Sequence, residues 1–173
     1  MSYVSNICIT TESGEKMQEI KSVQVIANQG IVNDRYFKED NDKDIQITFI
    51  ESENVDYYNQ ISGTNFLPTD FRRNVITKGI SLNELVGKEI LVGEVKMKVH
   101  RLCDPCRYLQ ELLVQKNLVK KLLNRGGLRC ELLTNGLINV NDVINVINVI
   151  NVININIIFK IIFKIISNTI RSS

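Results

Sequence analysis

The stretch that decides the fold is residues 81–102, SLNELVGKEILVGEVKMKVHRL. Gly87 and Gly93 interrupt two apolar alternating runs in it, which is typical of strands joined by tight turns. Apolar and polar residues alternate after Gly93, so one face of this segment is mostly apolar and the pattern predicts a half-buried strand. The apolar side chains on that face are Val95, Met97 and Val99. The stretch therefore predicts a β-hairpin.

Short apolar runs on either side of this hairpin predict further strands, separated by polar turns. The predicted strands are residues 3–10, 22–27, 45–50, 71–77, 128–133 and 136–144. Two helices are predicted, at 52–61 and at 107–125, and the second ends at a glycine pair. Because strands outnumber helices and do not alternate with them, the predicted fold class is mainly β, a β-rich α+β fold or barrel with a few short helices.

Length and charge exclude some classes of protein. A chain of 173 residues is long enough to bury one core without disulfide bonds. Its formal charge is +2, and no acid follows Asp142, whereas three of the basic residues do. The part up to Asp142 is therefore close to neutral and lacks the basic face that binding to a nucleic-acid backbone requires.

The end of the chain differs from the rest because a three-residue unit repeats in NDVINVINVINVININIIFKIIFKIIS. A period of three matches neither the repeat of a strand nor that of a helix. We therefore expect a domain over residues 1–145 and a low-complexity, Asn/Ile/Val-rich extension over residues 146–173. The asparagines and lysines of the extension disfavour a membrane span, and we expect no membrane contact by it.

Four cysteines carry the main chemical signal. The first residues, MSYVSNICITTESGEKM, lack the pattern of a secretory signal, so we expect a cytoplasmic, reducing location and thiols rather than structural disulfides. Two of the cysteines, Cys103 and Cys106, lie three positions apart in RLCDPCRYLQELL, residues 101–113, directly before the predicted helix.

This CxPC pair is compatible with several chemistries. Zinc is disfavoured, because the pair supplies only two ligands and no second pair has ligand spacing. A reversible disulfide remains open, and so does a single activated sulfur on Cys106, which follows Pro105 at the helix start between Arg101 and Arg107. Such a sulfur could bind a transition metal or a sulfane sulfur. A purely structural role for two small apolar side chains also remains open.

Two further segments suggest a site for an anion. In FRRNVIT, residues 71–77, Arg72 and Asn74 fall on the same face of the predicted strand and can offer a guanidinium and an amide to one ligand. In NQGIVNDRYF, residues 28–37, Asp34 and Arg35 can form an ion pair that orders a loop or contacts a ligand. A solvated arginine on the surface is the alternative for the first segment, and a surface ion pair without function is the alternative for the second.

Taken in order, four segments of the chain resemble the MOSC domain, which occurs at the C-terminus of molybdenum cofactor sulfurases and as a stand-alone protein. The segments are GIVNDRYF, FRRNVITKGISLNELVGKEILVGEVKMKV, RLCDPCRYL and GGLRCELLTNGLINVNDVI, and the resemblance spans about residues 5 to 145. It implies a barrel-like MOSC fold and binding of the molybdenum cofactor, a pterin that carries a phosphate and a dithiolene.

The resemblance also implies roles for individual residues. Cys106 matches a family cysteine that carries sulfur as a persulfide or ligates molybdenum. Arg72 and Asn74 match a pair that contacts the pterin, and Asp34 and Arg35 match a Gly-Asp-Arg segment. The resemblance thus implies that these four residues bind the cofactor. Asn33 stands where the family has glycine, and asparagine tolerates the positive φ of such a turn.

The predicted function is accordingly that of a MOSC-domain protein that binds molybdopterin and handles sulfur, with Cys106 as the reactive residue and Cys103 as its neighbour. The expected activity is sulfur transfer or a molybdenum-dependent oxidoreduction, with a sulfur donor or a molybdoenzyme as partner protein. The alternatives are a thiol–disulfide oxidoreductase that uses the CxPC pair, and a binding module for an anionic ligand. A pyridoxal-phosphate domain that could extract sulfur from cysteine is not visible in the sequence.

Overall fold

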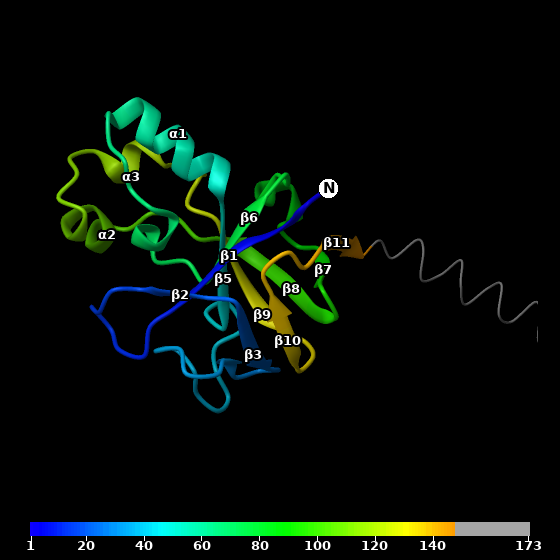
Figure 1. Cartoon of the computed structure of the whole chain (residues 1–173). Helices are drawn as coiled ribbons and strands as arrows, with labels where there is room; N and C mark the ends of the chain where they lie inside the picture. The colour runs from blue at the N-terminus through cyan, green and yellow to red at the C-terminus, as the bar shows by residue number, and fades with distance from the viewer. Residues whose placement is uncertain (148–173) are drawn as a thin grey trace, which may run out of the picture.

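Two β-sheets form the frame of the molecule in the computed structural model, which describes residues 1–147 (Figure 1). The larger sheet has eight strands in the order β11-β7-β8-β9-β5-β6-β1-β2, and the smaller has three in the order β10-β3-β4. The strands are β1 (Tyr3–Ile9), β2 (Gln18–Ile20), β3 (Ser22–Ile26), β4 (Gly30–Ile31), β5 (Ile47–Glu51), β6 (Val75–Lys78), β7 (Glu89–Val92), β8 (Val95–Leu102), β9 (Leu128–Leu132), β10 (Gly136–Asn139) and β11 (Ile144–Ile147).

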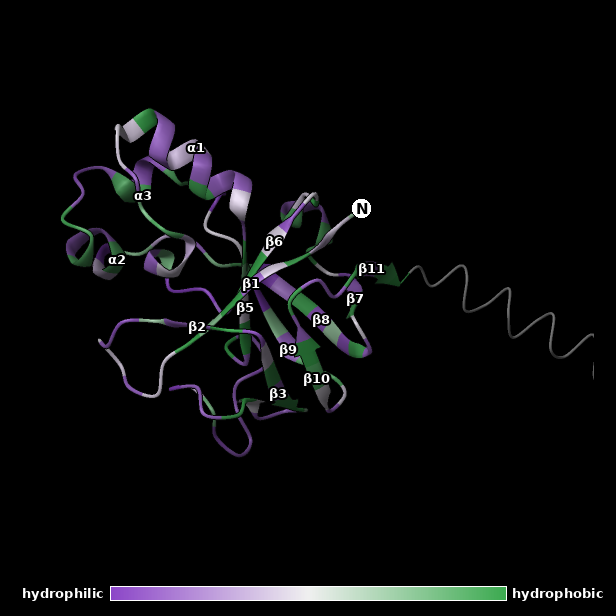
Figure 2. Cartoon of the chain, viewed as in Figure 1, coloured by the Kyte–Doolittle hydropathy of each residue, from purple (hydrophilic) through white to green (hydrophobic). Residues whose placement is uncertain are grey.

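The predicted hairpin is confirmed as β7 and β8, which pair antiparallel with Val92 opposite Val95. Figure 2 shows β8 banded by alternating hydropathy, and its apolar residues at 95, 97 and 99 are fully buried. The alternation ends there because a register shift against β9 follows Val99, so that Arg101 turns outward. Before the hairpin, residues Leu82–Leu85 form a 3₁₀ helix, η2, rather than a strand.

Most of the other predicted strands are also present, as β1, β3, β5 and β9. The predicted strand at 136–144 is wrong as a single element, because the chain turns between β10 and β11 with Asn141 in the left-handed region, at a φ of 75°. The predicted strand at 71–77 begins only at Val75.

The large sheet curls until the N-terminal segment meets the start of β11. β5 and β6 pair in parallel and are connected through helix α1 (Ser52–Ser62), whereas the other neighbouring strands of this sheet are antiparallel. A bridge joins Tyr3 to Val143, and the Ile144 amide donates to the Ser2 carbonyl at 3.0 Å. These contacts give the sheet its barrel-like form, as predicted.

Two hydrophobic clusters hold these elements together. The larger lies between the sheets and includes Val25, Phe49, Met97 and Ile138. The second lies beneath the helices and packs Tyr58 edge-on against Phe71. The helices gather over this second cluster at one end of the molecule (Figure 1).

The predicted helix at 107–125 is wrong as a continuous element. The segment forms two short helices, α2 (Arg107–Leu112) and α3 (Leu118–Lys121). Val114 and Asn117 between them adopt positive φ values of 52° and 65°, which stop a right-handed helix. The break lets Leu109 and Leu118, one from each helix, enter the second cluster.

The described residues end inside the region where we placed the domain boundary. β11 runs two residues past position 145, and the rest of the predicted extension, residues 148–173, lies outside the described part of the chain. Among residues 1–147, no helix has the length and apolar character needed to span a membrane.

Candidate functional site

A small pocket at the helical end of the sheet brings together four of the six predicted site residues, namely Arg35, Arg72, Cys103 and Cys106, whereas Asp34 and Asn74 do not line it. Its volume is about 110 Å³, and it is lined by side chains from several separate parts of the sequence. Four arginines and two cysteines stand out among the lining residues, namely Arg35, Arg72, Arg73, Arg129, Cys103 and Cys106. The lining residues include no acid. The pocket is therefore strongly cationic beside a pair of thiols.

Cys106 is the exposed thiol of this pocket. It precedes α2 directly, and its carbonyl accepts the first hydrogen bond of that helix, from the Gln110 amide at 3.2 Å. Cys103 also lines the pocket, but it is only 2% exposed. The remaining two cysteines, Cys8 and Cys130, are fully buried. Burial and the nearby Glu19 raise the pKa of Cys8 to about 12, and burial also raises the pKa of Cys130.

The segment that carries the cysteines is fixed by the glycine pair before β9. The Cys103 amide donates to the Gly127 carbonyl at 2.7 Å. A Cβ atom at Gly126 would clash with the Cys103 carbonyl oxygen and would lie 2.8 Å from the Pro105 nitrogen. Only glycine allows so close an approach of two backbones. The sequence suggested this glycine pair only as the end of a helix.

The Arg73 side chain binds both the cysteine segment and the glycine pair. Its Nε donates to the Gly126 carbonyl at 2.9 Å, and a terminal nitrogen donates to the Cys103 carbonyl at 3.2 Å. The other terminal nitrogen donates to the Phe71 carbonyl at 3.1 Å. The guanidinium is buried, and within residues 1–147 it makes no ion pair with a carboxylate.

Arg72 and Asn74 do not share a strand face, and that expectation is wrong. A 3₁₀ helix, η1 (Pro68–Phe71), ends immediately before Arg72, and Arg72 takes a left-handed φ of 60° because it caps that helix. β6 begins only after Asn74. The Arg72 guanidinium reaches the pocket and donates to the Glu15 carbonyl at 2.6 Å.

Asn74 points into the interior instead. Its Nδ2 donates to the Cys8 carbonyl at 3.3 Å and to Asp34 Oδ2 at 3.1 Å. Its Oδ1 accepts from the Thr48 hydroxyl at 2.8 Å and from the Thr48 amide at 3.2 Å. The side-chain amide of Asn74 thus links β5, β1 and the Asp34 loop behind the pocket.

Asp34 and Arg35 form the predicted pair. Arg35 lines the pocket and lies 3.7 Å from Asp34 Oδ2, and both side chains are buried. Asp34 also accepts from the Tyr36 amide at 3.2 Å. Burial raises the pKa of Asp34, against the opposing effects of Arg35 and of its hydrogen bonds. Asn33 has a φ of 65°, so the turn accepts asparagine as expected.

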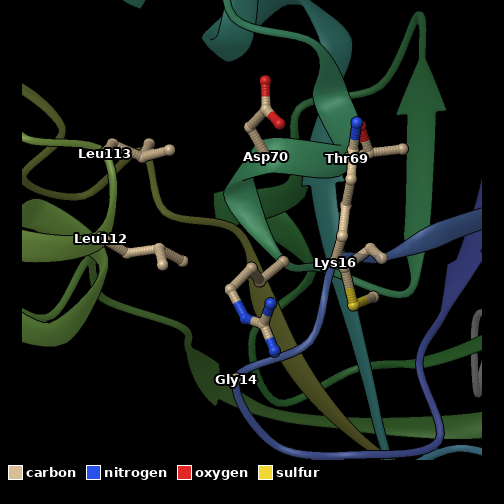
Figure 3. A pocket seen from close by; sticks show the side chains of 8 residues that line it. Gly14, Lys16, Thr69, Asp70, Leu112 and Leu113 are labelled. Atoms are coloured by element: carbon tan, nitrogen blue, oxygen red, sulfur yellow. The ribbon is translucent and has the colours of Figure 1, made fainter.

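A second pocket of about 250 Å³ adjoins the first, because Arg72 lines both. Figure 3 shows Leu112 and Leu113 extending from one side toward Lys16 and Thr69 on the other. This pocket combines an apolar wall with two cations, Lys16 and Arg72, and one acid, Asp70. Sequence reasoning missed Lys16, since a lone lysine in a polar loop carries no pattern.

Comparison with known protein families identifies the chain. A model of the MOSC domain matches residues 36–145 of the sequence. The chain belongs to the MOSC domain family. The match includes Arg72, Asn74 and both cysteines of the CxPC pair, whereas Asp34 and Arg35 lie just before it.

Solved structures share this MOSC fold. YuaD from Bacillus subtilis has a TM-score of 0.73 at 19% sequence identity, covering 83% of this chain and 94% of that chain. YiiM from Geobacillus stearothermophilus has a TM-score of 0.71 at 17% identity, covering 86% and 76%. YiiM from Escherichia coli has a TM-score of 0.66 at 16% identity, covering 86% and 70%. A search among curated proteins finds no match.

The residues of this MOSC domain fit an anionic group with a soft reactive end. Arg72, Arg73 and Arg129 form no ion pair with a carboxylate within residues 1–147. Arg129 lines the pocket, and its Nε is buried without a hydrogen-bond partner in that part of the chain, so this arginine has hydrogen-bonding capacity that no described residue uses. No group of three or more His, Cys, Asp or Glu that could hold a metal occurs among the described residues.

Proposed function

We propose that this MOSC domain binds the molybdenum cofactor and handles sulfur through Cys106. One observation carries the proposal: the exposed thiol lies in a pocket lined by four arginines and no acid. Guanidinium groups bind phosphate and other oxyanions through charge-assisted hydrogen bonds, and a thiolate is a ligand for soft metals and sulfane sulfur. The cofactor, when bound, supplies a redox-active metal held by dithiolene sulfur atoms.

The two adjoining pockets divide the binding between them. Pockets for organic ligands usually hold about 300 Å³ or more, so neither pocket reaches that size alone, whereas the two together do. The adjoining pocket of about 250 Å³ has the apolar wall that a ring needs. Arg72 borders both, so it can hold the anionic part of a ligand that reaches from one to the other, with Lys16 and Arg35 beside it.

Asp34 and Asn74 contribute by holding these groups in place. Asp34 orients Arg35 through their ion pair, and Asn74 fixes Asp34 by donating to its carboxylate. The two residues were predicted to contact the cofactor. In our proposal, Asp34 and Asn74 do not contact the cofactor themselves; they position Arg35 and the backbone around Arg35, which do.

Cys106 then has one of two roles. As a sulfur carrier, its thiolate attacks the outer sulfur of a donor persulfide, which forms a bond between Sγ and that sulfur and releases the donor thiolate. As a metal ligand, its sulfur stays on the metal, and the activity is oxidoreduction with partner proteins as electron donors. The arginine-lined pocket supports both, since each role places negative charge beside Cys106.

Metal and sulfur analysis tests the proposal. The full chain is purified without oxygen from cells that make the cofactor, and bound molybdenum, pterin and cyanide-releasable sulfur are measured. We expect Cys106→Ala to lose the releasable sulfur, or the molybdenum if Cys106 is a ligand. Arg72→Met should lower the bound pterin, whereas Lys21→Met, which removes an exposed positive charge outside the pocket, should not. Wild-type protein without pterin or releasable sulfur would contradict the proposal.

The thiol–disulfide alternative is supported by the presence of both cysteines in one pocket. It predicts that Cys103→Ser abolishes dithiol exchange with a small disulfide substrate, with no dependence on molybdenum. The sulfur-carrier role predicts that the same variant keeps its cyanide-releasable sulfur. If pterin binds and Cys106→Ala changes nothing else, the domain is a binding module without turnover.

A further inference from the structure

The size and the positive charge of the pocket beside Cys106 restrict its ligands more than binding of the whole cofactor would require. A volume of about 110 Å³ is enough for an anion of four to five heavy atoms, which needs the room of roughly four water molecules. We propose that this pocket takes a small sulfur-bearing dianion of the thiosulfate class, and that Cys106 accepts the outer sulfur from it. The inference rests on the proposed sulfur-carrier role of Cys106 and does not require cofactor binding.

Charge accounting favours a dianion. Arg35 is neutralised in part by Asp34 at 3.7 Å, whereas Arg72 and Arg73 have no such partner among residues 1–147. Arg129 makes no ion pair there either, but it lies close enough to Asp44 to help lower the pKa of that carboxyl. Burying guanidinium groups without counter-charge is costly, and an anion with two negative charges offsets that cost. A neutral sulfur donor would leave the cost in place.

The donors of the arginines are not equally available. Arg73 uses each of its three nitrogens on a backbone carbonyl, so it contributes charge and holds the cysteine segment in position. Arg129 makes only a 3.4 Å bond to the Asp44 carbonyl, and its buried Nε has no partner in the described part of the chain. The terminal nitrogens of Arg129 are thus more available than those of Arg73 to bind oxyanion oxygens directly.

The chemical step balances without a further reactant. The Cys106 thiolate attacks the outer sulfur of thiosulfate, which forms the Sγ–S bond of a persulfide. The S–S bond of thiosulfate breaks, and sulfite leaves with its electron pair. Negative charge builds up on the departing sulfite, where the guanidinium groups stabilise it. A thiophilic acceptor such as cyanide then takes the terminal sulfur and restores the thiolate.

Thiocyanate formation from thiosulfate and cyanide tests the inference on the full chain, with no molybdenum or pterin present. We expect turnover by the wild type and none by Cys106→Ser. Arg129→Met should lower kcat/KM for thiosulfate by roughly tenfold to hundredfold, the loss expected for one charge-assisted hydrogen bond. Arg129→Lys should recover part of it, and Lys21→Met should match the wild type.

A second measurement separates charge from folding. The rate of Cys106 alkylation is compared for iodoacetate, which is an anion, and iodoacetamide, which is neutral and of similar size. Arg129→Met should lower the ratio of the iodoacetate rate to the iodoacetamide rate, whereas general damage to the site changes both rates together. Arg72→Met serves in the same way if the first variant does not fold.

Two results would overturn the inference. One is wild-type thiocyanate formation no faster than that of Cys106→Ser. The other is a folded Arg129→Met variant with unchanged kcat/KM and an unchanged alkylation ratio. Protein that binds pterin but forms no thiocyanate would contradict this inference alone, and protein that forms thiocyanate but binds no pterin would contradict only the cofactor proposal.

Discussion

At the scale of single residues, exposure separates the four thiols of this MOSC domain. Cys106 is exposed, Cys103 is 2% exposed, and the other two are fully buried. Alkylating reagents need contact with the sulfur, so burial protects a thiol until the protein opens.

We therefore expect N-ethylmaleimide to modify one thiol per chain quickly in the native protein and all four in denaturant. Mass spectrometry of digested protein should place the fast label on Cys106, and Cys106→Ser should have no fast site. Fast labelling of two thiols in the native wild type would show that Cys103 is more accessible than the structure indicates.

Asp34 gives a prediction for pH dependence. Because its pKa is raised on folding, the folded protein keeps a proton on this carboxyl at pH values where the unfolded chain has lost it. The stabilisation is complete below the ordinary value of 3.8 and is lost as the pH rises through the raised value. We expect the stability advantage of wild type over Asp34→Asn to shrink as the pH rises from about 4.

Urea denaturation of both proteins across this pH range measures that difference. Asp34→Asn itself should cost roughly 1–3 kcal/mol, because the carboxylate accepts from Asn74 and from the Tyr36 amide and an amide replaces one of its acceptor oxygens. If the stability advantage of wild type over Asp34→Asn grew with pH, the effect of the Arg35 ion pair on the pKa of Asp34 would outweigh that of burial.

The residues of the site were predictable to different degrees. Cys106, Arg35 and Arg72 were found because each lies in a segment with a motif. Arg73 was missed because strand alternation placed it on the face opposite Arg72. Arg129 was missed because a single arginine in a strand has no local signal. Their place in the pocket depends on β5, β6 and β9 being neighbours, which is a property of the sheet order.

At the scale of elements, the cysteine segment packs against the glycine pair before β9 with no room for a side chain at Gly126. Adding a methyl group at Gly126 forces the Cys103–Pro105 backbone to move. We expect Gly126→Ala to lose about 1–3 kcal/mol of stability and to expose Cys103 to N-ethylmaleimide.

Gly63→Ala is the matched control for this substitution. Gly63 caps α1 at a φ of 63°, and no atom lies within 4 Å of the place that an added methyl group would take. Alanine there strains the backbone without displacing a neighbour. It should cost about 1 kcal/mol and leave the labelling pattern unchanged. Equal labelling of both variants would contradict the role given to Gly126.

The elements predicted well are those in which local pattern and packing agree. Alternation over residues 95–99 predicted β8 correctly, because one face of that strand is fully buried. The helical spacing of leucines over 107–125 did not show the break, since the left-handed residues Val114 and Asn117 are set by packing against the second cluster.

At the scale of the whole molecule, β11 completes the large sheet and sets where the domain can end. Ile144 is 3% exposed in the main cluster, and Val146 packs against it. We expect a chain that ends at Ile147 to melt at the same temperature as the full chain.

A chain that ends at Asp142 should lose several kcal/mol, because β7 loses a neighbouring strand and the main cluster loses the side chain of Ile144. Its Tm should fall by about 10 °C, or folding should fail altogether. Circular dichroism during heating measures both. Equal melting of the two shortened chains would show that β11 is dispensable.

The joining of Ser2 to Ile144 has a consequence for how the protein is made. A ribosome synthesises the pocket residues, the last of which is Arg129, before it reaches the strand whose start binds the N-terminus. The nascent polypeptide therefore carries a complete set of thiol and guanidinium groups while its sheet is still open. Chaperones that hold the emerging chain would protect that sulfur from oxidants during this interval.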